Sequence, residues 1–494
     1  MDASRQRSPW RSPVVAVCAA LLGVLLLIGL CAPLSGLLLS MKDYRPFHGL
    51  LNSAWVGLRN YEALWTTPAS RAALINGGIL WGMTTAAGLL IGLPLALAIA
   101  APRRRAFTAA LGGLMLLPMA VPELSWLLAV RALAPANAYA DAELYRWLYL
   151  AQTALPAAAF VALCGAAFSC ARRGPDGEGR LGAALRGVGA AALILALCAL
   201  SPSLRAILPG YSPAIYPVAD VPGTFAYRIG LQQAEFARAS ALHVVKAGAQ
   251  KALALPAAIA LAFVARPRRG ELAAQEKGGG VGAAFIALAI AAALTAAVLL
   301  PIKGGAPDGE QVYQLRKAAL LSLVSALGGG LLGFLLAAVT IYALKGLVGW
   351  GMAAFGLVLL TMPGNLAAEF LQMRGLGLVN TAAPSMLAAV YKPENLMLTL
   401  ALAAAASRSR ARGRELALAG AIGLIVAATA SGDYLAPMIY TSNESLQNLG
   451  LLLYKLQQPA GLQSALPVVH RLTLGAGLAL GCGAAALGAY GMSD

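Results

Sequence analysis

Few side chains in this sequence could do chemistry, and most of them lie inside long apolar runs. Glu123 and Trp126 are three residues apart, and Asn365 and Glu369 are four apart, so each pair shares one face of a helix. Carboxylates and amides bond hydroxyl groups, and an aromatic plane stacks on the apolar face of a sugar ring. These four residues are therefore candidates for a substrate path, since an ionisable side chain within a membrane is a functional candidate by default. The alternative is that they form interhelical hydrogen bonds and fill the core.

Motifs of the common enzyme classes are absent from the sequence. No lysine is followed by Ser or Thr, so there is no GxxxxGK[ST] phosphate loop, and HExxH and GxSxG are also missing. No pair of carboxylates has a spacing that indicates acid–base catalysis. The six cysteines lie in apolar segments without a CxxC pair or a ligand-like spacing to the three histidines. We expect no catalytic residue, no metal and no cofactor, which leaves transport, channel formation or membrane scaffolding.

The composition indicates a protein that crosses a membrane several times. Of the 494 residues, 59% are hydrophobic and only 12% are charged, whereas soluble domains have about 25% charged residues. The net charge of +17 comes from Lys and Arg in short turns between apolar segments, as in cytoplasmic loops of membrane proteins. This distribution argues against nucleic-acid binding.

Apolar runs of about 20 residues are long enough to cross a hydrocarbon core as helices. The first run follows a basic N-terminus and is too long for the core of a cleaved signal peptide, so we expect it to be retained. We predict an all-α membrane protein with twelve crossings, six in each half, at residues 13–40, 73–101, 107–133, 147–170, 188–204, 239–265, 281–302, 318–344, 347–372, 383–406, 416–432 and 471–490.

The distribution of basic residues predicts that both termini face the cytoplasm. With that orientation, nineteen Lys and Arg lie in inner loops and thirteen in the much longer outer connections. The inner loops are 1–12, 102–106, 171–187, 266–280, 345–346 and 407–415. The polar, Gly-rich stretch 266–280 resembles a linker, so we divide the chain into halves at 1–270 and 271–494.

Two of the predicted crossings fit this plan poorly because of their charged residues. His243, Lys246 and Lys251 in the sixth either face the protein interior or a water path, or belong to a solvated outer end. The sequence Tyr-Lys-Pro-Glu-Asn at 391–395 interrupts the tenth, which is either a broken helix or an error of one in the helix count. Lys392 and Glu394 either pair across this break near a site or are the remnant of a shortened loop.

Short motifs in the first half resemble those of a family of membrane transport subunits. Residues 55–61, Trp-Val-Gly-Leu-Arg-Asn-Tyr, are similar to the GL-x-NY signature of permease subunits of carbohydrate ABC importers. Leu117-Pro118 and Ser125-Trp126 match the LP and SW of the branch that imports oligosaccharides. Residues 223–241 resemble the start of the last helix of the same subunits.

The second half resembles the partner permease of that branch. Residues 361–381 contain Gly377-Leu-Val-Asn380-Thr, which is close to its GL-x-NT region. Asp433-Tyr434, with residues 439–447, resembles its WN-x-Y, IY and LQ stretch, although Ser-Gly at 431–432 replaces Trp-Asn. The five motifs occur in the expected order, which indicates two permease halves fused in one chain.

The resemblance implies an importer that moves a carbohydrate, in particular an oligosaccharide, across the cytoplasmic membrane by alternating access. It implies separate cytoplasmic ATPase subunits and an external sugar-binding protein as partners, and it adds Asp433 and Tyr434 to the substrate-path candidates. ATP hydrolysis is then expected on the partner subunits.

Such permeases bind their ATPases through a cytoplasmic EAA loop that forms a short helix, and we expect the loops 171–187 and 407–415 at that place. The first keeps Asp-Gly but has Ala-Arg-Arg in place of Glu-Ala-Ala, with the short helix expected at 178–187. The coupling candidates are Arg172, Arg173, Asp176, Gly177, Glu178, Arg180, Arg408, Arg410 and Arg412. The alternative is that both loops are ordinary positively charged inner turns.

Two other functions are consistent with the sequence. A twelve-helix secondary transporter would use Glu123 or Glu369 to couple transport to protons. A permease-like protein that no longer transports would act as a membrane scaffold or sensor, since the loops depart from the family pattern.

Overall fold

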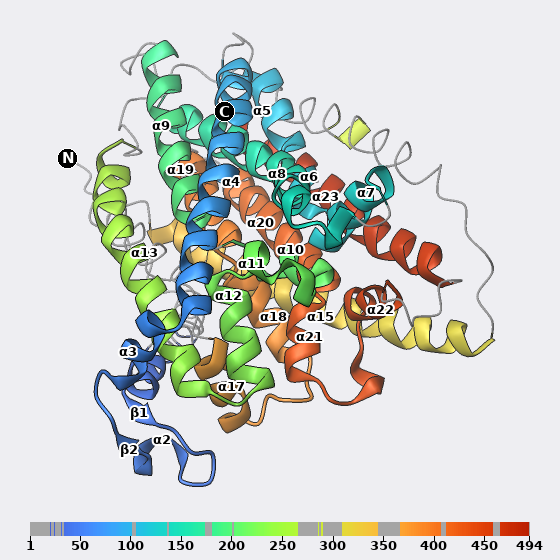
Figure 1. Ribbon diagram of the computed structural model, residues 1–494. Coiled ribbons are helices and arrows are strands. Elements are labelled where there is room, and N and C mark those ends of the chain that lie inside the picture. The colour runs from blue at the N-terminus through green and yellow to red at the C-terminus, as the bar shows by residue number, and fades with distance from the viewer. Residues whose placement is uncertain are drawn as a thin grey trace.

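The structure is a computed structural model that describes residues 34–100, 105–135, 138–172, 180–199, 202–264, 309–343, 366–406, 412–457 and 465–493, with a few isolated positions outside these ranges. Almost all of the described chain is helical, as expected (Figure 1). Its sheet is a short antiparallel pair, β1 (Lys42–Asp43) and β2 (Ala54–Trp55). The prediction of an all-α membrane protein is confirmed.

The described helices before residue 270 include three long ones, α4, α8 and α13, joined by short helices and turns. Their bounds are α2 (Gly49–Asn52), α3 (Arg59–Thr66), α4 (Pro68–Ala100), α5 (Arg105–Leu114), α6 (Leu117–Ala120), α7 (Glu123–Leu133), α8 (Ala142–Arg172), α9 (Arg180–Ala199), α10 (Leu204–Ile207), α11 (Tyr216–Ala219), α12 (Pro222–Ala226) and α13 (Phe236–Val264). A single π-helical turn, η5 (Tyr227–Gln232), precedes α13.

The helices described after residue 270 also include three long ones, α15, α20 and α23. Their bounds are α15 (Gly309–Ala343), α17 (Leu366–Gly375), α18 (Ala383–Val390), α19 (Pro393–Ala406), α20 (Arg412–Gly432), α21 (Leu435–Tyr440), α22 (Leu449–Leu456) and α23 (Leu466–Met492).

In the described part of the chain, five helices are long and apolar enough to cross a membrane, and a bent pair adds a sixth. The five lie in α4, α8, α15, α20 and α23. Most of the predicted crossings 13–40, 281–302 and 347–372 lies outside the described residues, so the total of twelve stays a prediction.

The predicted crossing 107–133 is a bent pair of segments, because the chain turns by 80° between residues 120 and 123. Proline lacks a backbone N–H and disfavours the helical conformation of the residue before it. Val121 accordingly has an extended ψ of 125°, and Pro122, with ψ 140°, is the N-cap of α7. Pro122 thus lies at the bend between α6 and α7.

The tenth predicted crossing, 383–406, is a broken helix. α18 ends at Val390 and α19 begins at Pro393. Asn395 compensates for the missing helical bonds, since its side-chain amide donates to the carbonyl of Ala389 at 2.8 Å. Lys392 lies in the break and belongs to neither helix.

The fifth crossing begins earlier than the predicted residue 188. α9 is continuous from Arg180 to Ala199, with no separate short helix ending at Gly187. A Cβ at Gly187 would lie 2.4 Å from the Ser169 hydroxyl and 2.7 Å from the Gly165 carbonyl, so α9 contacts the backbone of α8 at this point. Residues 180–187 are therefore part of a helix that packs along α8, which corrects the predicted helix 178–187 over this range.

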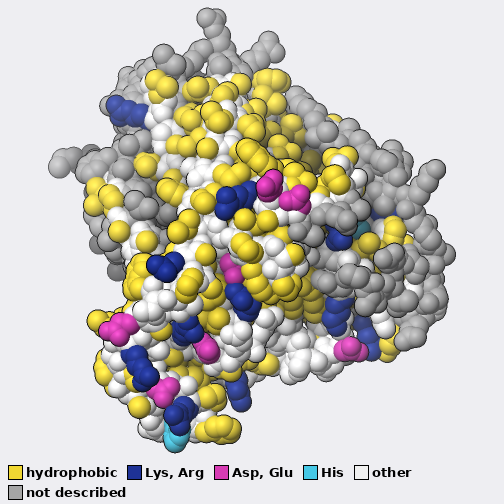
Figure 2. All heavy atoms as spheres, viewed as in Figure 1, with side chains coloured by type: hydrophobic (Ala, Val, Ile, Leu, Met, Phe, Trp, Pro, Cys, Tyr) yellow, Lys and Arg dark blue, Asp and Glu magenta, His cyan; other side chains and the backbone are white. Residues whose placement is uncertain are grey.

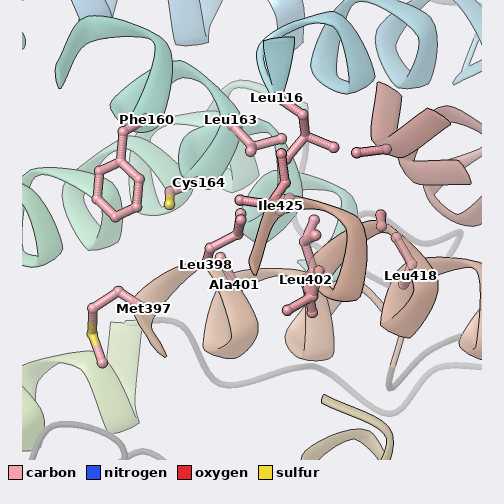
Figure 3. Close-up of a cluster of buried hydrophobic side chains, with 14 of the residues drawn as sticks. Leu116, Phe160, Leu163, Cys164, Met397, Leu398, Ala401, Leu402, Leu418 and Ile425 are labelled. Atoms are coloured by element: carbon pink, nitrogen blue, oxygen red, sulfur yellow. The ribbon is translucent and has the colours of Figure 1, made fainter. Parts of the chain in front are cut away.

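The helices from the two sides of residue 270 interlock. α4 packs on α8 and α9, and α20 packs on α15 and α23, but α5 and α6 also pack on α23, α19 on α8, and α17 on α13. The main core is shared in the same way, since Leu116, Phe160 and Leu163 belong to one buried cluster with Leu398, Leu402 and Ile425 (Figure 3). We call the surface along which these two sets of helices meet the seam.

Glycines allow the backbones to approach closely across the seam. A Cβ at Gly113 in α5 would lie 2.4 Å from the carbonyl oxygen of Ala485 in α23. A Cβ at Gly432 would lie 2.8 Å from the Pro122 ring. The absence of a side chain at Gly432 leaves room for the bend before α7. Small residues at helix contacts are the usual way to pack helices in membranes.

The two Gly-Leu-x-Asn motifs both form turns around a glycine. Gly57 and Gly377 have φ of +59° and +68°, a region that favours glycine. Asn60 donates to the carbonyls of residues 40 and 42, whereas the Asn380 side chain accepts from the backbone N–H of Ser442 at 2.8 Å. Each motif thus ties its turn to a distant strand or loop.

The surface has the distribution expected of a membrane protein. On the face shown in Figure 2, the upper part is mainly hydrophobic, and charged side chains gather toward the end where β1, β2 and α3 lie. Exposed large hydrophobic side chains on α4 and α15, including Ile75, Leu90, Leu320 and Leu327, fit contact with lipid.

Candidate functional site

The site is centred on Glu123, the first residue of α7 after the bend. Its Oε1 accepts a hydrogen bond from Lys392 Nζ at 2.7 Å, and its Oε2 accepts one from the Ser203 hydroxyl at 2.5 Å. Glu123 and Lys392 are 269 residues apart in sequence and come from opposite sides of the seam. The bend before α7 and the break before α19 place the two side chains against each other.

A cavity of about 130 Å³ opens beside this pair. Aromatic side chains form part of its wall, and polar side chains from α4, α8 and α19 form another part. The lining includes Thr84, Glu123, Trp126, Tyr149, Gln152, Phe160, Ser203, Lys392, Glu394 and Asn395. Trp126 Nε1 and Gln152 Oε1 have no hydrogen-bond partner among the described residues. Aromatic planes next to unsatisfied polar groups suit a ligand with apolar faces and hydroxyl edges.

A second ion pair crosses the seam close to the first. Arg205 Nε donates to Asp433 Oδ1 at 2.8 Å, and the Tyr434 hydroxyl donates to the Arg205 backbone carbonyl at 2.7 Å. The Asp433 side chain is almost fully buried. One acid and one base come from each side of the seam, because Glu123 and Arg205 precede residue 270 and their partners follow it. We call Glu123–Lys392 and Arg205–Asp433 the seam pairs.

Another carboxylate and another cation lie close enough across the seam to influence each other. Glu369 in α17 interacts electrostatically with Lys246 in α13 and with Arg205. His243 and Lys246 are buried in the protein, so the alternative of a solvated outer end is wrong for these two residues. The side chain of Lys251 lies outside the described residues.

The structure brings together some of the predicted substrate-path residues. Glu123 and Trp126 line the same cavity, as their spacing predicted. Asp433 and Tyr434 lie beside Arg205 and do not line it, and Glu369 lies apart on α17. Asn365 lies outside the described residues.

Most of the coupling candidates cannot be placed on an element. Arg172 ends α8, Arg180 begins α9 and Arg412 begins α20. The others lie outside the described residues: Arg173, Asp176, Gly177, Glu178, Arg408 and Arg410. Their role in binding an ATPase stays a prediction.

Sequence reasoning missed Ser203 and Arg205, and it did not connect Lys392 with Glu123, to which Lys392 donates a hydrogen bond. Arg205 follows directly after a predicted crossing, where a basic residue is expected at the membrane surface. Its burial depends on a fold that returns 204–232 into the protein as short helices. Lys392 was noticed because it interrupts an apolar run, but its contact with Glu123 depends on the interlocking of the helices.

A separate charged network lies within 204–232. Asp220 accepts hydrogen bonds from the Tyr211 hydroxyl and the Arg228 guanidinium, and Arg228 also lies over the Tyr216 ring at 4.3 Å. Burial raises the pKa of Asp220, an effect that the Tyr211 hydroxyl and the Arg228 guanidinium oppose. We call Tyr211, Tyr216, Asp220 and Arg228 the Asp220 cluster. It fixes a turn within one side of the seam.

No protein-family model and no curated protein matches the sequence. Two solved structures are similar. The first is a bacterial ABC transporter involved in the import of the acidic polysaccharide alginate, with 21% identity and a TM-score of 0.40, over 49% of this chain and 93% of the other. The second is the bacterial alginate ABC transporter in complex with an alginate pentasaccharide-bound periplasmic protein. Its identity is 20% and its TM-score 0.41, and the match covers 52% of this chain and 96% of the other.

Glu123 and Lys392 at the cavity are held in an ion pair, and no group of three or more His, Cys, Asp or Glu among the described residues could hold a metal ion. A polar, aromatic-walled cavity at the junction of two helix sets suits a ligand that is held and then released when the sets move.

Proposed function

We propose that this chain is the transmembrane component of an ABC importer that moves a carbohydrate, in particular an oligosaccharide, across the cytoplasmic membrane. The observation that carries the proposal is the cavity beside Glu123 and Lys392, since its wall combines aromatic planes with polar groups from both sides of the seam. The ordered permease-like motifs in both halves of the sequence support it independently.

The mechanism is alternating access, in which the cavity opens to one side of the membrane at a time. An external binding protein delivers the sugar, and separate ATPase subunits supply the energy through the loops 171–187 and 407–415. The seam pairs then act as latches, because relative movement of the two helix sets must separate Glu123 from Lys392 and Arg205 from Asp433. When an ion pair separates inside a membrane, each charged side chain needs another partner. The hydroxyl groups of a sugar can serve both, because a hydroxyl group donates hydrogen bonds to carboxylates and accepts them from cations.

The test is ATP-dependent uptake by the reconstituted chain. The tagged chain is purified from its own cells, the co-purifying ATPase is identified, and both are placed in proteoliposomes with ATP inside and labelled oligosaccharides outside with the binding protein. We expect uptake that needs ATP and stops when the Lys of the ATPase phosphate loop is replaced. Absence of a co-purifying ATPase, with uptake that runs without ATP, would overturn the proposal.

A proton-coupled transporter is the second candidate, because the paired Glu123 beside a cavity is also suited to exchange a proton. In the same vesicles, uptake abolished by an uncoupler and unaffected by the removal of ATP would favour it. The Glu123→Gln variant would then lose accumulation while keeping sugar exchange.

A further inference from the structure

One face of α13 carries a line of polar side chains that the cavity beside Glu123 does not use. His243, Lys246 and Gln250 are three, four and seven residues apart, which places them on one side of the helix. Each of these residues keeps less than a tenth of its surface exposed. Phe236 lies seven residues before His243, so it continues the same face toward the start of α13.

Several atoms on this face lack hydrogen bonds. Both ring nitrogens of His243 and Oε1 of Gln250 have no partner among the described residues. Burying polar atoms without partners is unfavourable, and such atoms in native proteins call for a specific explanation. Core packing alone would be served better by an apolar residue at 243.

The start of this face lies on the seam, where α13 packs against α17 from the other side. Lys246 and Glu369 have opposite charges and interact across it. At the start of α13, rings from both sides form a row, with centroid distances of 5.7 Å for Tyr44–Phe236, 6.4 Å for Phe236–Phe370 and 6.2 Å for Phe370–Tyr440. The aromatic rings thus lie at the N-terminal end of α13, and the polar side chains follow toward its C-terminal end.

Resting on the proposed function, we infer that the α13 face from Phe236 to Gln250 is a second sugar-binding stretch, separate from the cavity beside Glu123, and that it takes an uncharged, hydroxyl-rich ligand. Sugar hydroxyls donate and accept, so they satisfy the imidazole and the amide, and the sugar faces stack on the aromatic row. Lys246 and Glu369 balance each other in charge, which favours an uncharged ligand over an acidic one. The face is about 21 Å long at 1.5 Å per residue, so it fits an extended chain of sugar rings.

The stretch is covered in this structure, so the ligand reaches it when α13 and α17 separate. That requirement makes the inference testable by chemical access. Cysteine is introduced singly as His243→Cys and Gln250→Cys in the full chain, which is purified in lipid nanodiscs without an ATPase. A charged methanethiosulfonate reagent is added, and labelling of each position is measured by mass spectrometry of its own peptide. Ala241→Cys, at a fully buried core position of the same helix, is the matched control.

The expected result is slow labelling at 243 and 250 and none at 241, with labelling slowed at least threefold by a millimolar glucose pentasaccharide. A uronate pentasaccharide at the same concentration is expected to protect less. Absence of labelling at both positions, labelling without protection by either sugar, or protection by the uronate alone would each overturn the inference. Because no ATPase or ATP is present, a failure here leaves the ATP-dependent uptake experiment unaffected, and the reverse also holds.

The labelling can be interpreted only if substitutions on this face leave the protein folded, which a separate experiment checks. The His243→Asn and Gln250→Glu variants keep polar side chains and are compared with wild type by thermal unfolding. We expect His243→Asn to unfold within a few degrees of wild type and to keep part of the sugar protection at position 250 when it is combined with Gln250→Cys. Unchanged full protection in that double variant would exclude His243 from contact with the ligand.

Discussion

The seam pairs and the Asp220 cluster are built from the same residue types, but they join very different parts of the chain. The partners in the Asp220 cluster are eight or nine residues apart, whereas those in the seam pairs are 228 and 269 residues apart. A local network fixes a turn and moves as one body with its helices. A network between two helix sets holds them in one arrangement, and it must rearrange if the sets move. Buried charged groups therefore do two different things in this structure, since the Asp220 cluster fixes a local turn and the seam pairs join the two helix sets.

The largest expected effect comes from breaking the more buried seam pair. The Asp433→Ala change leaves the Arg205 guanidinium without its partner, and breaking a buried pair costs about 3–5 kcal/mol. We expect a fall in the free energy of unfolding of this size, measured by denaturant unfolding of the purified chain in detergent.

The matched control for that experiment removes both charges. In the Arg205→Met, Asp433→Asn double variant, Asn keeps an acceptor for the Leu435 backbone N–H, and no charge is left unpaired. We expect most of the stability to return but not the uptake. A double variant that transports normally would assign this pair to the same structural role as the Asp220 cluster.

The second effect tests the pair that borders the cavity. The Glu123→Gln and Lys392→Met changes, singly and together, form a double-mutant cycle, for which contacting residues give a coupling energy of about 1–3 kcal/mol. Both side chains keep about a fifth of their surface exposed, so we expect the lower part of this range. The measurement is uptake per folded molecule together with denaturant unfolding.

Charge reversal sharpens the same test. Glu123→Lys combined with Lys392→Glu restores an ion pair but loses the hydrogen bond from Ser203, so we expect partial recovery of uptake. Additive effects, without any recovery, would show that the two side chains act separately.

The third effect concerns the Asp220 cluster. The Arg228→Met change removes the ion pair and the contact with the Tyr216 ring, which we expect to lower the free energy of unfolding by about 1–2 kcal/mol, because Arg228 keeps a fifth of its side chain exposed. The KM for sugar uptake should not change.

The loss in this variant should depend on pH in a definite direction. The pKa of Asp220 is already raised by burial, and removal of the cation raises it further. The carboxyl is therefore protonated more readily in the folded than in the unfolded state, and the deficit should shrink as pH falls from 7 to 5. A deficit that grows on acidification would mean that Asp220 is not the group left without a partner.

The sequence predicted the fold class well and the site only in part. The length of an apolar run and the position of basic residues can be seen in the local sequence, so the membrane helices and the loops between them could be predicted. The Pro122 bend and the break at 391–395 were also visible, because proline and charge act locally. The contacts of Arg205 and Lys392 were not visible, since they depend on how α5, α6 and α19 cross the seam. Gly432 is an example of a residue whose role depends on such a crossing. Its sequence neighbours do not explain why it is glycine, whereas the structure does, because the Pro122 ring packs against its Cα.

The smallest expected effect separates the cavity wall from the seam pairs. Trp126 lines the cavity without a hydrogen bond to any described residue. If a sugar ring stacks on it, Trp126→Ala loses about 0.5–1.5 kcal/mol of binding, which is roughly a two- to twelvefold rise in KM. Trp126→Phe should keep most of the affinity, and the largely exposed Trp147 provides the control, since Trp147→Ala should leave KM unchanged. A fall in unfolding temperature with an unchanged KM would place Trp126 in the core, and the seam pairs would then be the only residues at this site with a role in transport.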